Sequence, residues 1–216
     1  MRNSLLSLLI IITVGSCVQP KEHNSRVVTL PYYDEPTFTP HWLTPGDAAL
    51  DTFHRIPAFS LTNQDGQQIT EATFEDKIYV VDFFFTFCPG ICPKMTAQMM
   101  TLQEEFVNDD DVLLMSHSVT PTRDSVPVLK RYAEDKGIRS GKWQLVTGSQ
   151  EDIYRLGRRA YFVEEDLGRE KDLEEFLHTE NFVLLDSDRH IRGIYNGLSK
   201  TSVSQLIADI YTLKGE

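Results

Sequence analysis

The sequence is poor in cysteine and in positive charge. It has three cysteines among 216 residues, and 21 Lys and Arg against 32 Asp and Glu give a net charge of −11. That balance argues against a nucleic-acid or anionic-membrane surface. No internal repeat or low-complexity tract is present. The remaining composition, 41% hydrophobic and 25% charged, is that of an ordinary globular protein with one domain.

The N-terminus lacks a hydrophobic run long enough to span a membrane, since the apolar stretch Leu5–Val14 is too short. Arg2 precedes it, and Val14-Gly15-Ser16-Cys17 resembles a bacterial lipobox. We therefore predict a lipoprotein signal peptide over residues 1–17, ending at a lipidated Cys17. Gly15 is a less usual residue at its position, so an uncleaved anchor or plain secretion is the alternative. The chain is expected in the bacterial cell envelope, lipid-anchored, with its domain on the periplasmic or another extracytoplasmic side.

After this leader, residues 18–55 read as a polar tether and a Pro- and aromatic-rich extended lead-in, and residues 56–216 as the folded domain. With Cys17 lipidated, the domain holds one thiol pair, Cys88 and Cys92. One bridge closing so small a loop would do little for stability. The pair is therefore expected to exchange disulfides or to bind a metal.

The two cysteines follow an apolar segment, Ile78–Phe85, that does not alternate and is predicted to be a strand buried on both faces. Pro89 and Gly90 break that strand, and Pro93 is tolerable only in the first turn of a helix. The thiols are thus predicted to lie on a strand-to-helix turn at the carboxyl end of a buried strand, where open α/β sheets place their chemistry.

The rest of the domain alternates strands with helices. The pattern predicts an α/β, thioredoxin-like fold, with a central mixed sheet flanked by helices, an N-terminal hairpin and an inserted charged excursion. A last helix capped by Thr201 or Ser202 is expected to end near Leu213. The predicted strands are Ala58–Leu61, Gln68–Thr70, Val112–Val119, Trp143–Thr147, Phe182–Asp186 and His190–Tyr195. The predicted helices are 93–107, one that begins near Ser125 and is ended by Gly137, and 149–161. The charged excursion is Glu164–Glu175.

The spacing of the thiols favours metal binding. On a continuous helix, residues four apart have Cβ atoms roughly 5–6 Å apart, longer than the roughly 3.8 Å that a disulfide prefers. Because Cys88 is expected in the loop, the turn can bring the sulfurs closer or let both reach one ion. Two thiolates select soft ions such as Cu(I) over hard cations. A structural zinc site would need four ligands, and no second cysteine pair exists.

A histidine is the most plausible third ligand, and the chain has six. His190 follows a polar turn and is expected to be exposed. His117 lies late in a strand and is expected to be a semi-buried histidine with satisfied hydrogen bonds, while His178 lies in a polar loop and is free to point at the thiols. Spacing does not choose between these two. Solvated or capping roles are expected for His23, His41 and His54.

Four segments resemble the Sco/SenC family, thioredoxin-fold copper proteins that assist cytochrome c oxidase assembly. They are Phe85–Met95, Val119–Pro127, Leu145–Ser149, and His178-Thr179 with the strand that follows. The resemblance implies a chaperone that binds Cu(I) or Cu(II) through Cys88, Cys92 and His178. It also implies delivery to the copper A site of oxidase subunit II.

The sequence departs from the family pattern at three positions. Gly90 stands where an aspartate often lies between the cysteines, Leu177 where an acidic residue usually precedes the ligand histidine, and Thr120 where an aspartate is common. These changes leave the ligands intact but alter groups that would orient them.

Asp82 supports an alternative function. It interrupts the apolar strand six residues before Cys88, where thioredoxin has a buried aspartate that assists proton transfer to the dithiol. The chain would then be a thiol–disulfide oxidoreductase acting on oxidase cysteines or other exported proteins and recharged by a periplasmic thiol reductant. A purely structural carboxylate paired with Lys77 or Lys94 is equally compatible with this position.

Overall fold

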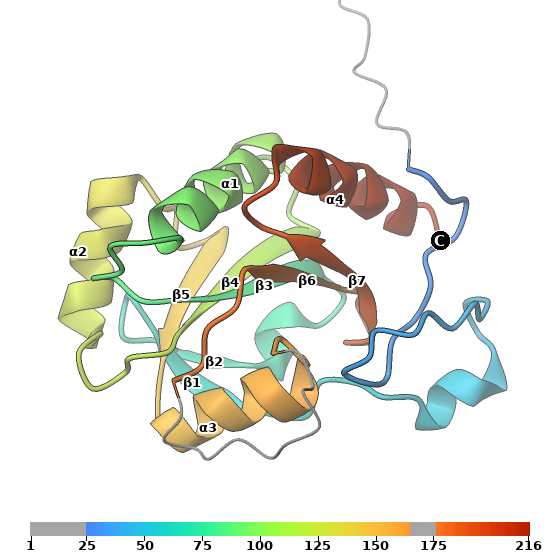
Figure 1. The fold of residues 1–216 in the computed structure, drawn as a ribbon, viewed down its shortest axis with the longest axis horizontal. Coiled ribbons are helices and arrows are strands. Elements are labelled where there is room, and N and C mark those ends of the chain that lie inside the picture. The colour runs from blue at the N-terminus through green and yellow to red at the C-terminus, as the bar shows by residue number, and fades with distance from the viewer. Residues whose placement is uncertain (1–24, 165–175) are drawn as a thin grey trace, which may run out of the picture.

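A computed structural model describes residues 25–164 and 176–216. They form a seven-stranded mixed sheet in the order β2-β1-β5-β4-β3-β6-β7, with α1 and α4 on one face and α3 on the other (Figure 1). The predicted thioredoxin-like α/β architecture is confirmed. The predicted signal peptide with Cys17, the histidine His23 and residues 165–175 of the predicted excursion lie outside the described residues.

The sheet and its covering helices follow the predicted order along the chain. The strands are β1 Ser60–Asn63, β2 Gln68–Thr70, β3 Ile78–Phe84, β4 Val112–Ser118, β5 Trp143–Thr147, β6 Asn181–Leu185 and β7 Ile191–Asn196. The helices are α1 Cys92–Glu105, α2 Val126–Lys136, α3 Gln150–Arg155 and α4 Lys200–Leu213, with 3-10 turns at Ala48–Thr52 and Glu71–Phe74 and a π-helical turn at Leu156–Ala160.

Strand β3 is buried along its whole length, as the apolar run predicts. It pairs in parallel with β4 and antiparallel with β6. Because side chains alternate along a strand, Val80 and Phe84 pack in the core beneath α1 and α4, while Val81 and Phe83 pack in the core beside α3. Asp82 lies between two residues of the first set, so its carboxylate faces the helix that begins at Cys92.

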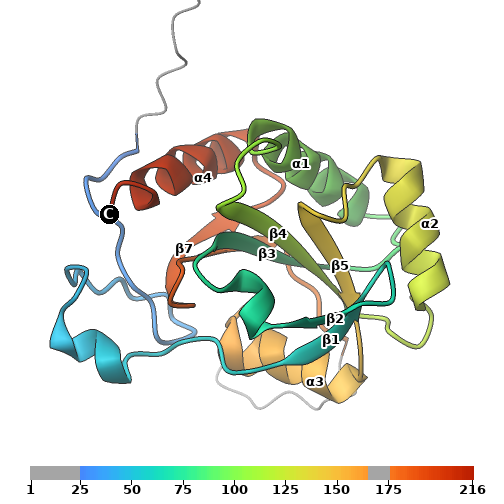
Figure 2. The same cartoon turned by 180° about the vertical axis from the view of Figure 1, so that it is seen from behind.

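The lead-in is held against the C-terminal part of the domain, and Figure 2 shows the two ends of the described chain side by side. Tyr33 bridges to Ile191 in β7. The buried Arg192 donates hydrogen bonds to the carbonyl oxygens of Leu30 and Pro31 and pairs with Asp186 and Glu216. These contacts fix residues 30–33 on the domain.

Two local predictions are wrong. Ser199, not Thr201 or Ser202, caps α4, because its backbone is extended and its hydroxyl accepts the Ser202 N–H. His190 is buried rather than exposed, because the rings of Tyr32 and Phe53 from the lead-in contact it. The error at His190 arises because Tyr32 and Phe53 lie far from it in the sequence.

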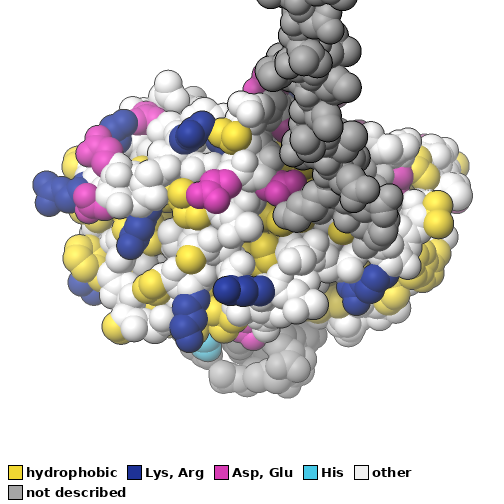
Figure 3. All heavy atoms as spheres, turned by 90° about the horizontal axis from the view of Figure 1, so that it is seen from above, with side chains coloured by type: hydrophobic (Ala, Val, Ile, Leu, Met, Phe, Trp, Pro, Cys, Tyr) yellow, Lys and Arg dark blue, Asp and Glu magenta, His cyan; other side chains and the backbone are white. Residues whose placement is uncertain are grey.

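No helix of the described residues is long and apolar enough to cross a membrane. On the face above α1 and α4, acidic and basic side chains are interspersed among hydrophobic and polar ones (Figure 3). The negative net charge is therefore not gathered into one acidic patch on this face.

Candidate metal centre

The two thiols lie where the sequence predicts, at the carboxyl end of β3. The strand ends at Phe84 and α1 begins at Cys92, with Pro93 in its first turn. Cys88 lies in the connecting loop, where its N–H donates to the Phe85 carbonyl oxygen at 3.3 Å. Cys88 is half-buried, Cys92 is buried, and the two are not bridged. The turn therefore places a half-buried thiol beside a buried one.

The two thiols differ sharply in acidity. Burial alone would raise the pKa of Cys88, but hydrogen bonds from the Cys92 thiol and from the backbone N–H groups of Gly90, Ile91 and Cys92 outweigh it and lower the pKa. Burial, together with the hydrogen bond to Cys88, raises the pKa of Cys92 to about 12. Cys88 is therefore the thiol that ionises first, and it is the better nucleophile and the first soft-metal donor.

Asp82 has a neutral hydrogen-bond partner and no lysine. Ser116 on β4 donates to its carboxylate, and the Trp143 indole N–H donates to the Ser116 oxygen at 2.7 Å. Burial raises the pKa of Asp82 to about 7. The predicted structural alternative, a pair with Lys77 or Lys94, is wrong at least for Lys77, whose ammonium group pairs with Asp111 at 3.6 Å. The carboxyl group can thus gain and lose a proton near neutral pH.

A second buried aspartate, Asp124, anchors the start of the thiol loop. Its carboxylate accepts hydrogen bonds from the backbone and hydroxyl of Thr86, and from the hydroxyls of Ser118 and Thr120. This role of Asp124 was not predicted from the sequence. The signal lay in the hydroxyl residues around it in Ser118–Ser125. Thr120, the third departure from the family pattern, is one of these donors.

The loop also presents an aromatic surface. Phe87, next to Cys88, is 61% exposed, and the Arg123 guanidinium lies over its ring at 5.1 Å from the centroid. The segment 120–124 therefore contacts the thiol loop at two points, inside through Asp124 and outside through Arg123.

His178 is exposed, and two aromatic ring contacts link it to the thiol loop. Its ring stacks on Phe176 at 6.4 Å between centroids, and Phe176 meets Phe85 edge-on at 5.4 Å. Within residues 25–164 and 176–216, no three Cys, His, Asp or Glu side chains are close enough together to hold a metal ion. The structure brings Cys88 and Cys92 together and leaves His178 outside that pair.

His117 lies on the other face of the sheet from Asp82. It is fully buried and stacked on Phe83 at 4.7 Å, and neither of its ring nitrogens has a hydrogen-bond partner. The expectation that its hydrogen bonds are satisfied is wrong, because its neighbours are aromatic rings rather than polar groups. Burial lowers the pKa of His117 to about 3, so the ring is neutral.

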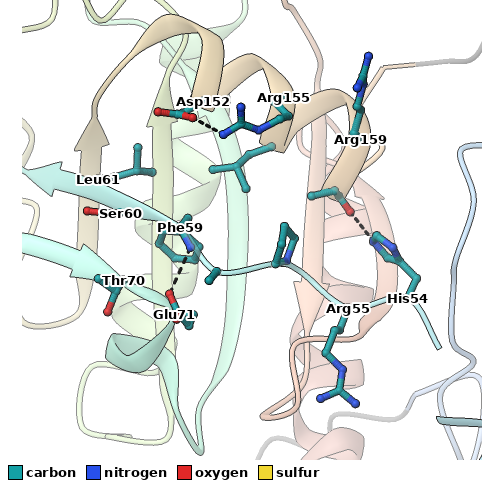
Figure 4. A pocket seen from close by; sticks show the side chains of 14 residues that line it. His54, Arg55, Phe59, Ser60, Leu61, Thr70, Glu71, Asp152, Arg155 and Arg159 are labelled. Atoms are coloured by element: carbon teal, nitrogen blue, oxygen red, sulfur yellow. Dashed lines mark hydrogen bonds and ion pairs between the residues drawn. The ribbon is translucent and has the colours of Figure 1, made fainter. Parts of the chain in front are cut away.

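Two lead-in histidines have partners away from the thiols, as the sequence suggested. His41 lies 3.0 Å from an Asp34 oxygen, and His54 donates to the Ala160 carbonyl oxygen at 2.8 Å. His54 helps to line a cavity of about 850 Å³, together with residues drawn from the segments 55–61, 70–71 and 152–160. Figure 4 shows His54 at one side of this cavity. No residue of the thiol loop lines this cavity, so it is separate from the candidate metal centre.

The donors available at the thiol loop suit a soft ion. Two unbridged sulfurs, one reachable from solvent, are the ligands that Cu(I) prefers. The chemistry of this pair therefore fits a copper ion.

Comparison with known proteins agrees with the Sco/SenC resemblance. The SCO1/SenC family profile matches residues 48–214. The chain is 29% identical over 161 residues to the SCO1 protein homolog of Bacillus subtilis, an alignment covering 73% of this chain and 81% of that protein.

Three solved structures are similar in fold. A SCO1/SenC family lipoprotein from Bacillus anthracis has a TM-score of 0.65 at 30% identity, covering 74% of this chain and 95% of the other. BsSco, described with a disulfide switch as a member of the Sco family of cytochrome c oxidase assembly proteins, has a TM-score of 0.62 at 28% identity, covering 74% and 93%. Arabidopsis thaliana ScoI with copper bound has a TM-score of 0.58 at 25% identity, covering 74% and 98%.

Proposed function

Because the chain belongs to the SCO1/SenC family, we propose that it is a membrane-tethered copper chaperone. Cys88, Cys92 and His178 bind one copper ion, as Cu(I) or Cu(II), which is then passed to the copper A site of subunit II of cytochrome c oxidase. The main support is the pair of unbridged thiols in hydrogen-bond contact at the carboxyl end of β3. The copper-bound state of a similar structure supports the cargo.

The three donors have distinct parts in uptake and release. Cys88, half-buried and the more acidic thiol, is the first to meet an incoming ion. Cys92 is buried and loses its proton as the ion replaces it. His178 is exposed and completes the set from the solvent side. On release, the exposed His178 and the half-buried Cys88 exchange first with ligands of the receiving protein, and the buried Cys92 exchanges last.

The proposal includes the division of the chain. Residues 1–17 are the lipoprotein signal peptide ending at lipidated Cys17, residues 18–55 the tether and lead-in, and residues 56–216 the copper-binding domain. The B. anthracis relative is itself a lipoprotein, which supports the anchor. A tethered domain would act on the extracytoplasmic side of the bacterial membrane, where its oxidase partner exposes the receiving site.

The test is a copper titration of the fully reduced protein against a competing chelator. Wild type is expected to bind one equivalent, His178→Ala to bind at least tenfold more weakly, and Cys88→Ser to lose tight binding. His41→Ala is the matched control, because His41 is partly exposed and paired with Asp34 away from the thiols. Equal affinity in His178→Ala and wild type would remove His178 from the ligand set.

Asp82 favours a second function, thiol–disulfide exchange. In this reaction the Cys88 thiolate attacks a partner's disulfide, forms a mixed disulfide and expels one partner thiolate. Cys92 then attacks the Cys88 sulfur, its proton passes to Asp82, and the second partner thiol leaves. Two electrons move from the dithiol to the partner, and a periplasmic thiol reductant restores the dithiol. The support is a buried carboxyl group with a pKa of about 7 on the strand below Cys92.

This exchange reaction predicts a trapped intermediate. Cys92→Ser should accumulate a mixed disulfide between Cys88 and a model peptide disulfide, and Cys88→Ser should not. Asp82→Asn should slow resolution and flatten its pH dependence near neutrality. A Cys92→Ser variant that traps no disulfide would rule the exchange function out and leave copper delivery untouched.

A further inference from the structure

Residues 176–180 carry His178 on an extended segment that alternates between solvent and core. Phe176, His178 and Glu180 are exposed, whereas Leu177 and Thr179 are buried. Successive side chains of an extended chain point to opposite sides. Burying Leu177 therefore turns its neighbours Phe176 and His178 toward solvent together.

The space that receives Leu177 exists because residue 157 is a glycine. A Cβ atom at Gly157 would lie 2.6 Å from the Leu177 Cδ1 atom, closer than real Cβ atoms approach, and 3.1 Å from the Phe83 ring, which is tighter than most real contacts. Leu177 is fully buried in this space. Any side chain at position 157 would force the end of the Leu177 side chain to shift.

Gly157 belongs to the π-helical turn Leu156–Ala160, whose wide ring is closed by the Tyr161 N–H and the Leu156 carbonyl oxygen at 2.8 Å. Such turns are rare and are often found at functional sites. At the end of the turn, the Ala160 carbonyl oxygen accepts a hydrogen bond from the His54 ring, which lines the neighbouring cavity (Figure 4). The turn is thus fixed on one side by the lead-in and receives Leu177 on another.

Phe176 links the same segment to the thiol loop. Its ring lies nearly parallel to that of His178, at 17°, and nearly perpendicular to that of Phe85, at 89°. The Phe85 carbonyl oxygen accepts the Cys88 N–H. The imidazole is therefore connected to the cysteine loop through two ring contacts and one backbone hydrogen bond.

We propose that Phe176 and Leu177, with Gly157 as the receiving position, are positioning residues that hold His178 ready to complete the copper site. The buried Leu177 side chain holds the segment against the core, and the Phe176 ring orients the His178 imidazole toward the thiol loop. This inference rests on the proposed function. It also accounts for Leu177, a departure from the family pattern, as a buried anchor at the ligand histidine.

The test uses the reduced protein, Cu(I) and a competing chelator. Phe176→Ala removes an exposed ring and is expected to fold, and its Cu(I) affinity should fall about tenfold. Phe176→Tyr, which keeps the ring, should restore wild-type affinity. Trp42→Ala, which removes another exposed aromatic side chain from the lead-in, should have no effect. Leu177→Ala should weaken binding and Leu177→Met should restore it.

A double-variant cycle separates positioning from general loss of structure. If Phe176 acts through His178, then Phe176→Ala combined with His178→Ala should bind Cu(I) no more weakly than His178→Ala alone. In the copper-free protein, proton NMR should show a ring-current shift of the His178 imidazole protons that disappears in Phe176→Ala.

The outcomes distinguish the two proposals. Additive losses in the cycle, or wild-type affinity and an unchanged imidazole spectrum in Phe176→Ala, would overturn the positioning role while leaving the copper site intact. Wild-type affinity in His178→Ala would overturn the ligand assignment, and the positioning role with it.

Discussion

Asp82 and His117 are buried on opposite faces of the same pair of strands, and burial shifts their pKa values in opposite directions. The pKa of Asp82 rises to about 7, because its charged form loses hydration that one Ser116 hydroxyl only partly replaces. The pKa of His117 falls to about 3, because burial removes the water that would hydrate its charged form. Both groups prefer to be neutral in the folded protein, so they make stability depend on pH in opposite senses.

Asp82 is predicted to make the protein less stable as pH rises. Its folded pKa lies above the unfolded value near 3.8, so its contribution is complete below pH 3.8 and is lost as pH rises through 7. Between pH 5 and pH 8 this amounts to about 2–3 kcal/mol. Urea unfolding should show that Asp82→Asn lacks this loss. An identical change in wild type and variant would show that the carboxyl group is not buried uncharged.

His117 is predicted to make the protein less stable in acid. Its folded pKa lies below the unfolded value near 6.5, so its contribution is complete above pH 6.5 and declines as pH falls toward 3. Relative to His117→Phe, which keeps a ring against Phe83, wild type should lose about 2 kcal/mol between pH 7 and pH 5. Unfolding of both proteins at the two pH values measures this. A constant difference between them would contradict the buried, neutral state of the ring.

The thiol loop is organised by the elements around it as much as by its own residues. The end of β3 leads into the loop, the end of β4 supplies Ser118, and the turn before α2 supplies Asp124. Four hydrogen bonds converge on one buried carboxylate. Such an acceptor is costly to remove because each donor is left without a partner.

Asp124→Ala is predicted to destabilise the fold by about 3 kcal/mol and to loosen the thiol loop. Hydrogen exchange at the Thr86 amide, which donates to Asp124, should become much faster. Asp135→Ala removes an exposed acidic side chain from α2 and serves as the control, with a change below about 0.5 kcal/mol. Unchanged protection of Thr86 in Asp124→Ala would mean that the carboxylate does not hold the loop.

The sequence predicts those features of strands and helices that depend on residues close together in the chain. The apolar run of β3, the Pro–Gly break after it and Pro93 place both cysteines correctly, and Gly137 ends α2 in the left-handed conformation as expected. The π-helical turn is a different case, because it is tied to Leu177, about twenty residues further along the chain. No pattern within Leu156–Ala160 reveals that contact.

The same limit applies to the candidate site. The resemblance to a known family nominates His178, but its contact with Phe85 through Phe176 depends on how two distant segments meet. The predicted exposure of His190 is wrong for the same reason, because Tyr32 and Phe53 of the lead-in cover it. The sequence shows which residues are neighbours along the chain, whereas these contacts join segments that only the fold brings together.

At the scale of the whole molecule, the lead-in is part of the folded structure rather than a loose connector. Arg192 is buried among two carboxylates and two backbone carbonyl oxygens, and its guanidinium lies over the Tyr32 ring at 3.9 Å from the centroid. Glu216 also accepts the Leu30 N–H at 2.7 Å. Both ends of the described chain therefore meet at one buried arginine.

Arg192→Met is predicted to release the lead-in, because it leaves Asp186 and Glu216 buried without their cation. The expected loss of stability is about 3–5 kcal/mol, with faster trypsin cleavage at Arg55. Arg155→Met is the matched control, since Arg155 is exposed and its ion pairs with Glu151 and Asp152 lie on the surface; it should cost about 1 kcal/mol or less. Wild-type cleavage rates in Arg192→Met would show that other contacts hold the lead-in.

The measurement that bears most directly on the copper site is X-ray absorption at the copper edge, on reduced protein loaded with one equivalent of Cu(I). The expected spectrum shows two sulfurs and one nitrogen bound to copper, with the outer scattering of an imidazole ring that disappears in His178→Ala. A shell of two sulfurs alone in the wild type, identical to that of His178→Ala, would contradict a site built from Cys88, Cys92 and His178.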